Sequence, residues 1–265
     1  MSKISAIVIA KNEENMIADC LDSVSFCDEI IVVDGGSDDR TVEVAKRMNA
    51  KVFQLKTSDF SKLRNFGLDK AKNEWVLYVD TDERATLELV SSIKYQVLSI
   101  SNNKYSAYKI QRKNFYLGNH EWPYIERLER LFKKENLKGW KGELHESPII
   151  HGKIGELNGY LLHYTHRDLT LMLNKTIEWS KIEAELRFKA GHPQMVWWRF
   201  LRVMLTAFFD WYIRQKGYKA GTVGLIESIY QMFSIFITYA RLWEIQNKVK
   251  SPSFAKASEG KQNEK

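Results

Sequence analysis

Two aspartates separated by one residue follow a short apolar run and are the strongest candidates for chemistry in this chain. The run Trp75-Val76-Leu77-Tyr78-Val79 leads directly into Asp80-Thr81-Asp82-Glu83. In an extended chain, residues i and i+2 point to the same side, so both carboxylates would face one edge of a sheet. Such a pair repels unless a cation joins it, and Mg²⁺ or Mn²⁺ prefers oxygen ligands. The pattern predicts a divalent-metal site, although an acidic turn that caps a helix at Thr86 would have the same residues.

A third carboxylate, Asp34, ends the apolar run 30–33 and opens Asp34-Gly35-Gly36-Ser37. At the end of a strand it could accept hydrogen bonds from a base or a ribose, and the glycines permit a tight turn. An ordinary turn with a helix cap is the alternative. Arg64, on the predicted helix before the Asp80 strand, could face a diphosphate. Taken alone, Arg64 is more simply explained as a solvent-exposed helix charge.

The hydrophobic pattern predicts a scaffold that brings these strand ends together. Continuous apolar runs are typical of strands buried on both faces, and they occur at 4–10, 30–33, 51–55 and 75–79. Segments with helical spacing lie between or after them, at 16–24, 42–48, 63–71 and 86–99. This alternation predicts an α/β domain with a mostly parallel sheet, whose strands end at a common ligand-binding edge.

The pattern changes twice further along the chain. Short strands over 105–164 predict mixed or antiparallel sheet, and helices are predicted over 169–189, 195–213 and 222–246. We expect the following organisation: a domain over 1–168 with halves 1–100 and 101–168, a helical region over 169–249, and a disordered tail over 250–265.

Positive charge is concentrated in the predicted helical region. Of the net charge of +7, residues 187–250 contribute ten basic and only three acidic side chains, and they hold 14 of the 33 aromatic residues. This composition predicts contact with an anionic membrane surface. Arg202, Asp210 and Glu227 interrupt the apolar runs and argue against a spanning helix. The alternatives are a helical subdomain packed on the first domain or on a second copy, and a non-catalytic scaffold that binds membrane or nucleic acid.

Several classes of protein are excluded by what the motifs lack. The first strand runs into Ala10-Lys11-Asn12-Glu13, which has no glycine for a dinucleotide turn, and no P-loop motif is present. Cys20 and Cys27 cannot form a disulfide framework or a zinc site by themselves. The first residues lack the features of a signal peptide, which predicts a cytoplasmic protein.

Taken together, these motifs resemble the family 2 inverting glycosyltransferases with the GT-A fold. The resemblance rests on Lys-Asn-Glu-Glu after the first strand, Asp-Gly-Gly-Ser-Asp-Asp-Arg-Thr from Asp34, Arg64-Asn65-x-Gly67, and Val79-Asp80-Thr81-Asp82-Glu83. The rest of the chain, to about residue 246, is similar to lipopolysaccharide core β-1,4-glucosyltransferase-like proteins. The motifs that carry this narrower resemblance are Arg130-Leu131-Phe132, Leu144-His145-Glu146, Leu162-His163-Tyr164 and residues 239–244.

The resemblance implies a role for each candidate residue. It implies that the nucleotide pocket is lined by Ala10, Asn12, Glu13 and Asp34. It also implies that Arg64 faces the donor, that Asp80 contacts the ribose or the metal, and that Asp82 binds Mg²⁺ or Mn²⁺. The processive-synthase motif Gln-x-x-Arg-Trp is absent, which implies transfer of a single sugar. We expect a UDP-sugar as donor, with glucose first among the sugars, a glycan or glycolipid acceptor in envelope biosynthesis, and no nucleic acid.

The catalytic base and a third metal ligand are less well marked. The Glu-Asp pair that many family members use as base is absent, and Glu146 is our candidate in its place, with Glu143 second. A structural ion pair with an arginine or lysine is the alternative for Glu146. Four histidines lie within 145–166 without a zinc-protease motif. One of them, with His163 as the candidate, could be a further metal ligand, although a structural histidine is the simpler explanation.

Overall fold

The computed structural model describes residues 3–98 and 104–248, and these divide into two compact units. The sheet unit contains residues up to Phe115 together with Ile125–Thr165, and the helical unit contains Tyr116–Tyr124 and the chain from His166 onward. The sequence placed the boundary at 168 and did not predict that 116–124 would belong with the helices. The predicted tail at 250–265 lies outside the described residues.

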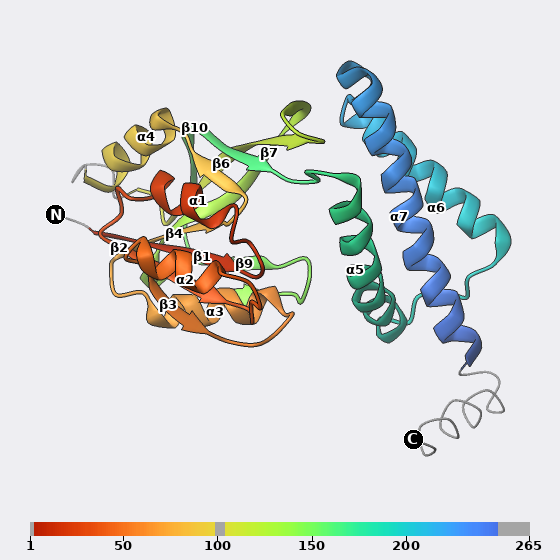
Figure 1. Ribbon diagram of the computed structural model, residues 1–265, viewed down its shortest axis with the longest axis horizontal. Helices are drawn as coiled ribbons and strands as arrows, with labels where there is room; N and C mark the ends of the chain where they lie inside the picture. Colours follow the sequence, from red (N-terminus) through yellow and green to blue (C-terminus); the bar gives the residue numbers. More distant parts are fainter. Residues whose placement is uncertain (1–2, 99–103, 249–265) are drawn as a thin grey trace, which may run out of the picture. The chain divides into compact units, whose positions relative to one another are not determined.

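An eight-stranded sheet in the order β3-β2-β1-β4-β7-β6-β10-β5 forms the centre of the sheet unit (Figure 1). Its strands are β1 (Ile4–Ala10), β2 (Glu29–Asp34), β3 (Lys51–Gln54), β4 (Trp75–Asp80), β5 (Glu83–Ala85), β6 (Ala107–Tyr116), β7 (His120–Lys133) and β10 (Ile154–Tyr164). The first four in space pair in parallel, as do β6 and β10, whereas β7 runs antiparallel to β4 and β5 antiparallel to β10. The predicted α/β class with a mostly parallel sheet is confirmed.

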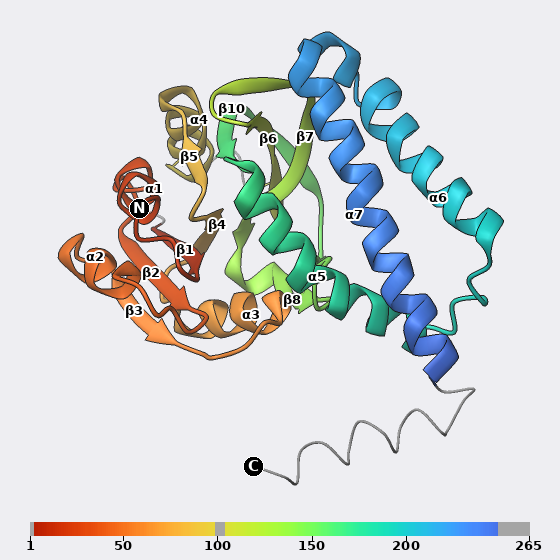
Figure 2. The same ribbon diagram turned by 45° about the vertical axis from the view of Figure 1, so that its right-hand side comes forward.

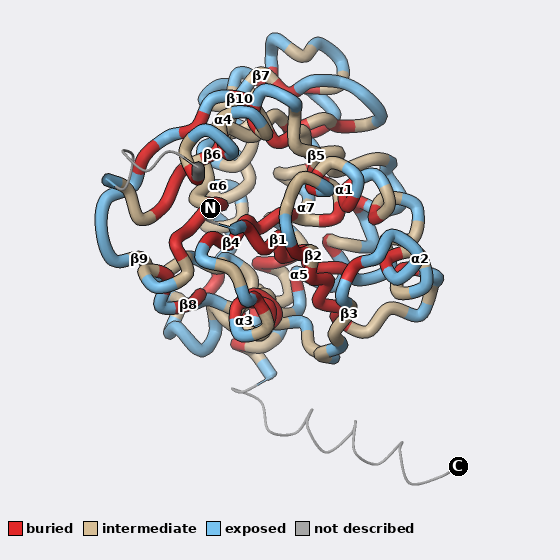
Figure 3. The backbone as a smooth tube through the Cα atoms, turned by 90° about the vertical axis from the view of Figure 1, so that its left-hand side faces the viewer, coloured by how far each residue is buried: buried red, intermediate tan, exposed pale blue. Residues whose placement is uncertain are grey.

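Helices cover both faces of this sheet because its central strands are apolar throughout. All seven residues of β1 are buried (Figure 3). Ala6 and Val8 pack in the core below α1 (Ile17–Ser23), α2 (Thr41–Arg47) and α4 (Leu87–Leu98). Their neighbours Ile7 and Ile9 point to the other face, where α3 (Phe60–Lys70) lies. The strand predictions at 4–10, 30–33 and 75–79 and the intervening helices are confirmed.

Helix α3 approaches β1 closely, and this approach needs a glycine. A Cβ on Gly67 would lie 2.5 Å from Cγ2 of Ile7. Asp59 caps the helix by accepting a hydrogen bond from the backbone N–H of Lys62. The close packing places Arg64, one turn before Gly67, below the end of β4.

A small hairpin is attached to α3 and carries the loop with Glu146. Its strands are β8 (Leu137–Lys141) and β9 (Ser147–Ile150). The Asn65 side chain donates to the Trp140 carbonyl at 2.9 Å and accepts from the Trp140 N–H at 2.7 Å, so it fixes β8 against α3. The backbone N–H of Phe60 also donates to the Glu143 carbonyl. The loop between β8 and β9 is therefore held at the start of α3.

Three long helices make up most of the helical unit (Figure 2): α5 (Leu169–Lys189), α6 (Trp197–Phe209) and α7 (Gly221–Lys248). A π-helical turn over 210–214 extends α6, and a 3₁₀ turn over 217–220 precedes α7. Both α5 and α6 pack against α7. The sequence predicted these three helices correctly. Between residues 105 and 164, however, it predicted only short strands, and the structure has three long ones, β6, β7 and β10, in addition to the short β8 and β9.

Candidate active site

The register of the parallel strands brings the predicted carboxylates to one edge of the sheet. Asp34 ends β2 beside Ala10, and Asp80 ends β4 beside Ile9, which is the residue before Ala10. The candidate residues at the ends of β1, β2 and β4 therefore lie on adjacent strands, as the motif positions predicted. This placement gathers them but does not by itself assign their roles.

A chain of buried ion pairs runs across this edge. Arg64 contacts Asp80 Oδ1 at 3.0 Å and Glu146 Oε1 at 2.8 Å, and its side chain is only 3% exposed. Arg130 contacts the other Asp80 oxygen at 2.7 Å and Glu83 at 3.3 Å. The Arg64 guanidinium also lies 4.8 Å from the centre of the Trp140 ring, a cation–π contact. Both oxygens of Asp80 are thus held by arginines.

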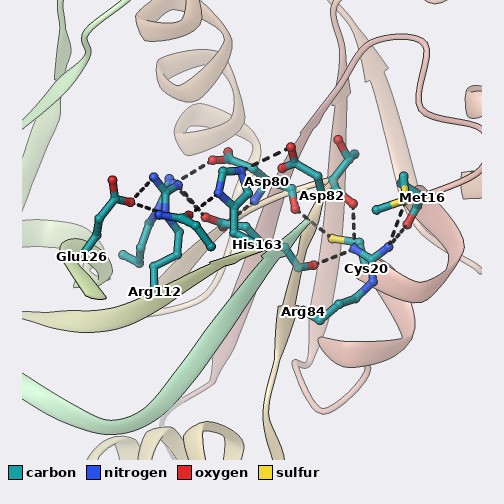
Figure 4. A network of polar contacts seen from close by, with 12 residues as sticks. Met16, Cys20, Asp80, Asp82, Arg84, Arg112, Glu126 and His163 are labelled. Atoms are coloured by element: carbon teal, nitrogen blue, oxygen red, sulfur yellow. Dashed lines mark hydrogen bonds and ion pairs between the residues drawn. The ribbon is translucent and has the colours of Figure 1, made fainter. Parts of the chain in front are cut away.

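The network continues from Glu83 through Arg112 to Glu126. Arg112 contacts Glu83 at 3.0 Å and forms a very short ion pair with Glu126, visible on the left of Figure 4. Glu83 is fully buried, and its other oxygen accepts a hydrogen bond from the backbone N–H of Asp80. Glu83 therefore anchors the turn that carries both aspartates of the motif.

The site as a whole carries more negative than positive charge. The network contains five carboxylates and four guanidinium groups; the residues are Asp80, Asp82, Glu83, Glu126 and Glu146, with Arg64, Arg84, Arg112 and Arg130. Burial by itself raises the pKa of Asp80, but the charges of Arg130 and then Arg64 outweigh it and hold that pKa well below its usual range. Asp80 is therefore ionised at neutral pH.

His163 faces Asp82 with an orientation set by a buried amide. The His163 Nδ1 lies 2.7 Å from Asn114 Oδ1, and its Nε2 lies 3.3 Å from Asp82 Oδ2 (Figure 4). Because an amide oxygen only accepts hydrogen bonds, Nδ1 carries the proton. In the neutral ring, Nε2 then presents a lone pair toward Asp82. Metal-binding histidines are commonly oriented in this way through their second nitrogen.

The residues present fit a divalent ion at Asp82 and His163 better than at Asp80. A separation of 3.3 Å is close to the roughly 3 Å between adjacent ligands of an octahedral ion with bonds of about 2.1 Å. Asp80 is instead occupied by two arginines. Over 3–98 and 104–248, no group of three acidic, histidine or cysteine side chains is arranged to hold a metal. A metal at this pair would need further ligands from a substrate or from water.

The turn predicted to line a nucleotide pocket is tightly organised. Asp34 is fully buried and accepts hydrogen bonds from the backbone and hydroxyl of Ser37 and from Gln54. Asn12, exposed and with a positive φ of 56°, accepts from the backbone N–H of Asp38. The Ala10 carbonyl accepts from Gly35, and the Glu13 N–H donates to Thr41. Asp34 thus holds the turn together, and exposed Asn12 lies at its surface.

The structure includes Glu146 in the ion-pair chain and keeps Glu143 outside it. The alternative raised from the sequence for Glu146, an ion pair with an arginine, is present in the contact with Arg64. The contact uses Oε1, which accepts from Arg64 Nε at 2.8 Å. An ion pair of this kind orients a carboxylate and does not exclude it from accepting a proton through its other oxygen.

Sequence reasoning missed most of the residues that brace the site. These are Glu83, Arg112, Asn114, Glu126, Arg130 and Trp140. A signal existed in the arginines and glutamates that interrupt the runs 107–116 and 120–133, because a charge in a buried strand needs a partner. Arg130 also belongs to a motif of the predicted resemblance. The pairing itself depends on strands that are far apart in sequence.

Comparison with known proteins defines the class. Residues 5–155 match the family model for glycosyl transferase family 2. The chain is 31% identical over 94% of its length to an uncharacterized glycosyltransferase of Rickettsia typhi, of which it covers 89%. It is also 23% identical over 91% of its length to the lipopolysaccharide core biosynthesis glycosyltransferase LpsC of Rhizobium meliloti, of which it covers 92%.

Solved structures show a more distant likeness. Glucosyl-3-phosphoglycerate synthase from Mycobacterium tuberculosis, solved with Mn²⁺, UDP and glucosyl-3-phosphoglycerate, has a TM-score of 0.45 at 18% identity, over 73% of this chain and 81% of that one. Residues 1–349 of S. aureus TarS have a TM-score of 0.46 at 16% identity, over 94% of this chain and 91% of that one.

The protein is therefore a glycosyltransferase. It belongs to family 2, whose members act with inversion at the anomeric carbon, as the motifs predicted. The predicted similarity to lipopolysaccharide core glycosyltransferases is confirmed by the match to LpsC.

Proposed function

We propose that the protein transfers a single sugar from a nucleoside diphosphate donor to a glycan or glycolipid acceptor of the cell envelope, with Mg²⁺ or Mn²⁺ bound at the site. UDP-sugars, and UDP-glucose first, are the donors to test. The similarity to LpsC supports an envelope acceptor. The proposed place of the reaction is the cytoplasmic side of the inner membrane.

The observation that carries the proposal is the orientation of His163 toward Asp82. Asn114 holds the ring so that Nε2 faces the Asp82 carboxylate. Asp82 and His163 would hold the metal, with the donor diphosphate completing its ligands. Bound there, the ion would act as a Lewis acid on the leaving diphosphate.

The arginines organise the site around the bound donor. Arg64 forms ion pairs with Asp80 and Glu146, and Arg130 forms ion pairs with Asp80 and Glu83. These contacts hold both guanidinium groups in place. We assign Asp80 to holding these guanidinium groups in place rather than to binding the metal. Arg64 Nη1 and Arg130 Nε are buried and have no hydrogen-bond partner among the described residues. The arrangement keeps positive charge beside the position proposed for the diphosphate.

Glu146 is the proposed base. Arg64 binds Oε1 and thereby fixes the carboxylate, and Oε2 accepts the proton from the acceptor hydroxyl as that oxygen attacks the anomeric carbon. The bond to the diphosphate breaks on the opposite face, so an α-linked donor gives a β-linked product. Asn12 and the turn braced by Asp34 are assigned to the nucleoside, together with the backbone near Ala10 and Glu13.

The test is calorimetric titration with UDP, GDP and dTDP, each with and without Mn²⁺. We expect one nucleotide to bind only with metal, and Asp82→Asn to abolish this metal-dependent binding. The matched control is Asp69→Asn, which removes an exposed aspartate of α3 and should leave binding unchanged. Metal-independent binding by the unmodified protein would instead favour a protonated His163 paired directly with Asp82. Absence of binding to all three nucleotides would refute the donor-site assignment.

A further inference from the structure

Helix α7 buries several polar residues and leaves several large apolar residues exposed. Of its eight buried residues, Leu242 is the one aliphatic residue; the others are Gly224, Glu227, Ser228, Tyr230, Thr238, Tyr239 and Gln246. Six large apolar side chains are nevertheless 37–46% exposed, namely Leu225, Ile226, Ile229, Phe233, Phe236 and Trp243, whereas Ile235 and Ile245 pack partly buried against the cluster that contains Leu242. A helix packed on a core in water shows the reverse distribution.

The seam between α5 and α7 consists of small and hydroxyl-bearing residues. Thr176 Oγ1 lies 2.7 Å from Tyr230 Oη and 3.2 Å from Ser234 Oγ. Ser180 and Ala184, one and two turns further along α5, are buried as well. Helices that pack through small residues and interhelical hydrogen bonds, with apolar side chains facing away, are typical of a lipid environment.

The one charged residue between 221 and 240 points inward. Glu227 is fully buried, and its Oε1 lies 2.8 Å from both His166 Nδ1 and Gln231 Nε2. An acidic residue in an apolar segment is expected to face the interior of a helical assembly when the outside is lipid. By length and composition, Gly217–Lys248 is also the one helix in the described part of the chain that could cross a membrane.

Helix α6 shows a second outward-facing apolar stripe. Phe200 and Val203 pack toward α7, with Phe200 5.8 Å from Phe236 between ring centres. The exposed side chains lie at intervals of four residues and are 45–76% exposed; they are Trp197, Leu201, Leu205, Phe209 and Ile213. A contiguous stripe of this kind marks a surface that is covered by something other than water.

Basic residues accompany these stripes and identify what covers them. Arg199 and Arg202 lie on the Trp198 ring at 4.9 and 5.8 Å, an aromatic–cationic group of the kind found at membrane interfaces. Residues 187–250 carry ten basic and three acidic side chains, which complement anionic lipid headgroups. Helix α6 is shorter than the about 20 residues that a spanning helix needs.

We propose that α6 and α7 insert into one leaflet of an anionic lipid bilayer, with the two apolar stripes among the acyl chains and the arginines at the headgroups. This inference goes beyond the donor and metal assignments and does not depend on them. It accounts for the large apolar side chains that α6 and α7 leave exposed, which folding in water does not explain.

The test is flotation of the full-length protein with vesicles. One set contains phosphatidylethanolamine and phosphatidylglycerol, and the other contains phosphatidylcholine alone. We expect strong binding to the anionic vesicles and weaker binding to the neutral ones. High salt should reduce the bound fraction without abolishing it, because apolar insertion is not screened. Leu205→Glu combined with Phe209→Glu should lower the partition coefficient by about 100-fold or more.

The controls distinguish insertion from unfolding and from self-association. Leu87→Glu replaces an 86% exposed leucine of the sheet unit and should not change binding. Circular dichroism must show unchanged helix content in each variant. Complete release by salt, or no flotation with either vesicle type, would overturn the proposal. So would a stable dimer in sedimentation that the α6 substitutions convert to a monomer, since a second copy would then cover the stripes.

Discussion

Asn114 provides the sharpest test of the metal assignment because it would act without touching the metal. Its Oδ1 accepts the His163 Nδ1 proton at 2.7 Å, and the residue is 3% exposed. Replacing it by leucine keeps a similar volume but removes the acceptor. The ring is then free to rotate, and the proton can move to Nε2, where it blocks the lone pair that faces Asp82.

The expected loss of metal affinity follows because Asn114 contacts the proposed ligand His163 and not the metal itself. Loss of such a supporting hydrogen bond lowers metal affinity by about 10- to 100-fold, or roughly 1.4–2.7 kcal/mol. We therefore expect the Kd for Mn²⁺, measured by calorimetry at saturating UDP, to rise by that factor in Asn114→Leu. Activity at low Mn²⁺ should fall in parallel and recover at high Mn²⁺, because the ligands themselves remain.

A partly buried hydrogen bond elsewhere in the sheet unit controls for a general loss of stability. Tyr108→Phe removes the contact between Tyr108 Oη and Gln96 at 3.1 Å and should leave the Mn²⁺ affinity unchanged. An unchanged Mn²⁺ Kd in Asn114→Leu, in a folded protein, would show that His163 is not a ligand and would refute the reasoning.

Two further predictions concern the carboxylates. Glu146→Gln should lower kcat by about 10²–10⁴-fold with little change in donor binding, whereas Glu143→Gln should retain activity; the opposite result would make Glu143 the base. Asp80→Asn should lower the free energy of unfolding by about 2–4 kcal/mol in denaturant titrations, because it weakens the pairing of buried Arg64 and Arg130. Since the pKa of Asp80 is depressed in the folded state, its stabilisation is complete above about pH 4 and is lost as the pH falls further. The variant should therefore lose less stability than the native protein in acid, and equal losses would contradict this account.

Much of the sheet unit follows from local pattern. The apolar runs at 4–10, 30–33 and 75–79 can only be buried on both faces, and the segments between them have helical spacing. Parallel pairing of such strands places their carboxyl ends together, so Asp34 and Asp80 were expected at one edge. The helices of 169–248 were predicted for the same reason, since periodicity is a local property.

Local sequence pattern could not predict which residues form ion pairs and hydrogen bonds with the site residues. Glu83 is the least conspicuous residue of its motif in the sequence, yet it is fully buried between two arginines from β6 and β7. Asn114 has no distinguishing pattern around it, because its function depends on the register that places it beside His163. Nothing in the sequence indicated that both carboxylate oxygens of Asp80 would be held by arginines.

The sequence by itself determined the α/β class, the family and the edge of the sheet at which the candidate residues meet, because each of these depends on residue types at short spacing. Tertiary structure alone decided which carboxylate faces a histidine and which is neutralised by arginine, because ion pairs join residues 16 to 82 positions apart. It also decided that α7 turns several polar residues inward. The apolar residues that define a helix do not reveal, until the neighbouring helix is placed, which side faces protein.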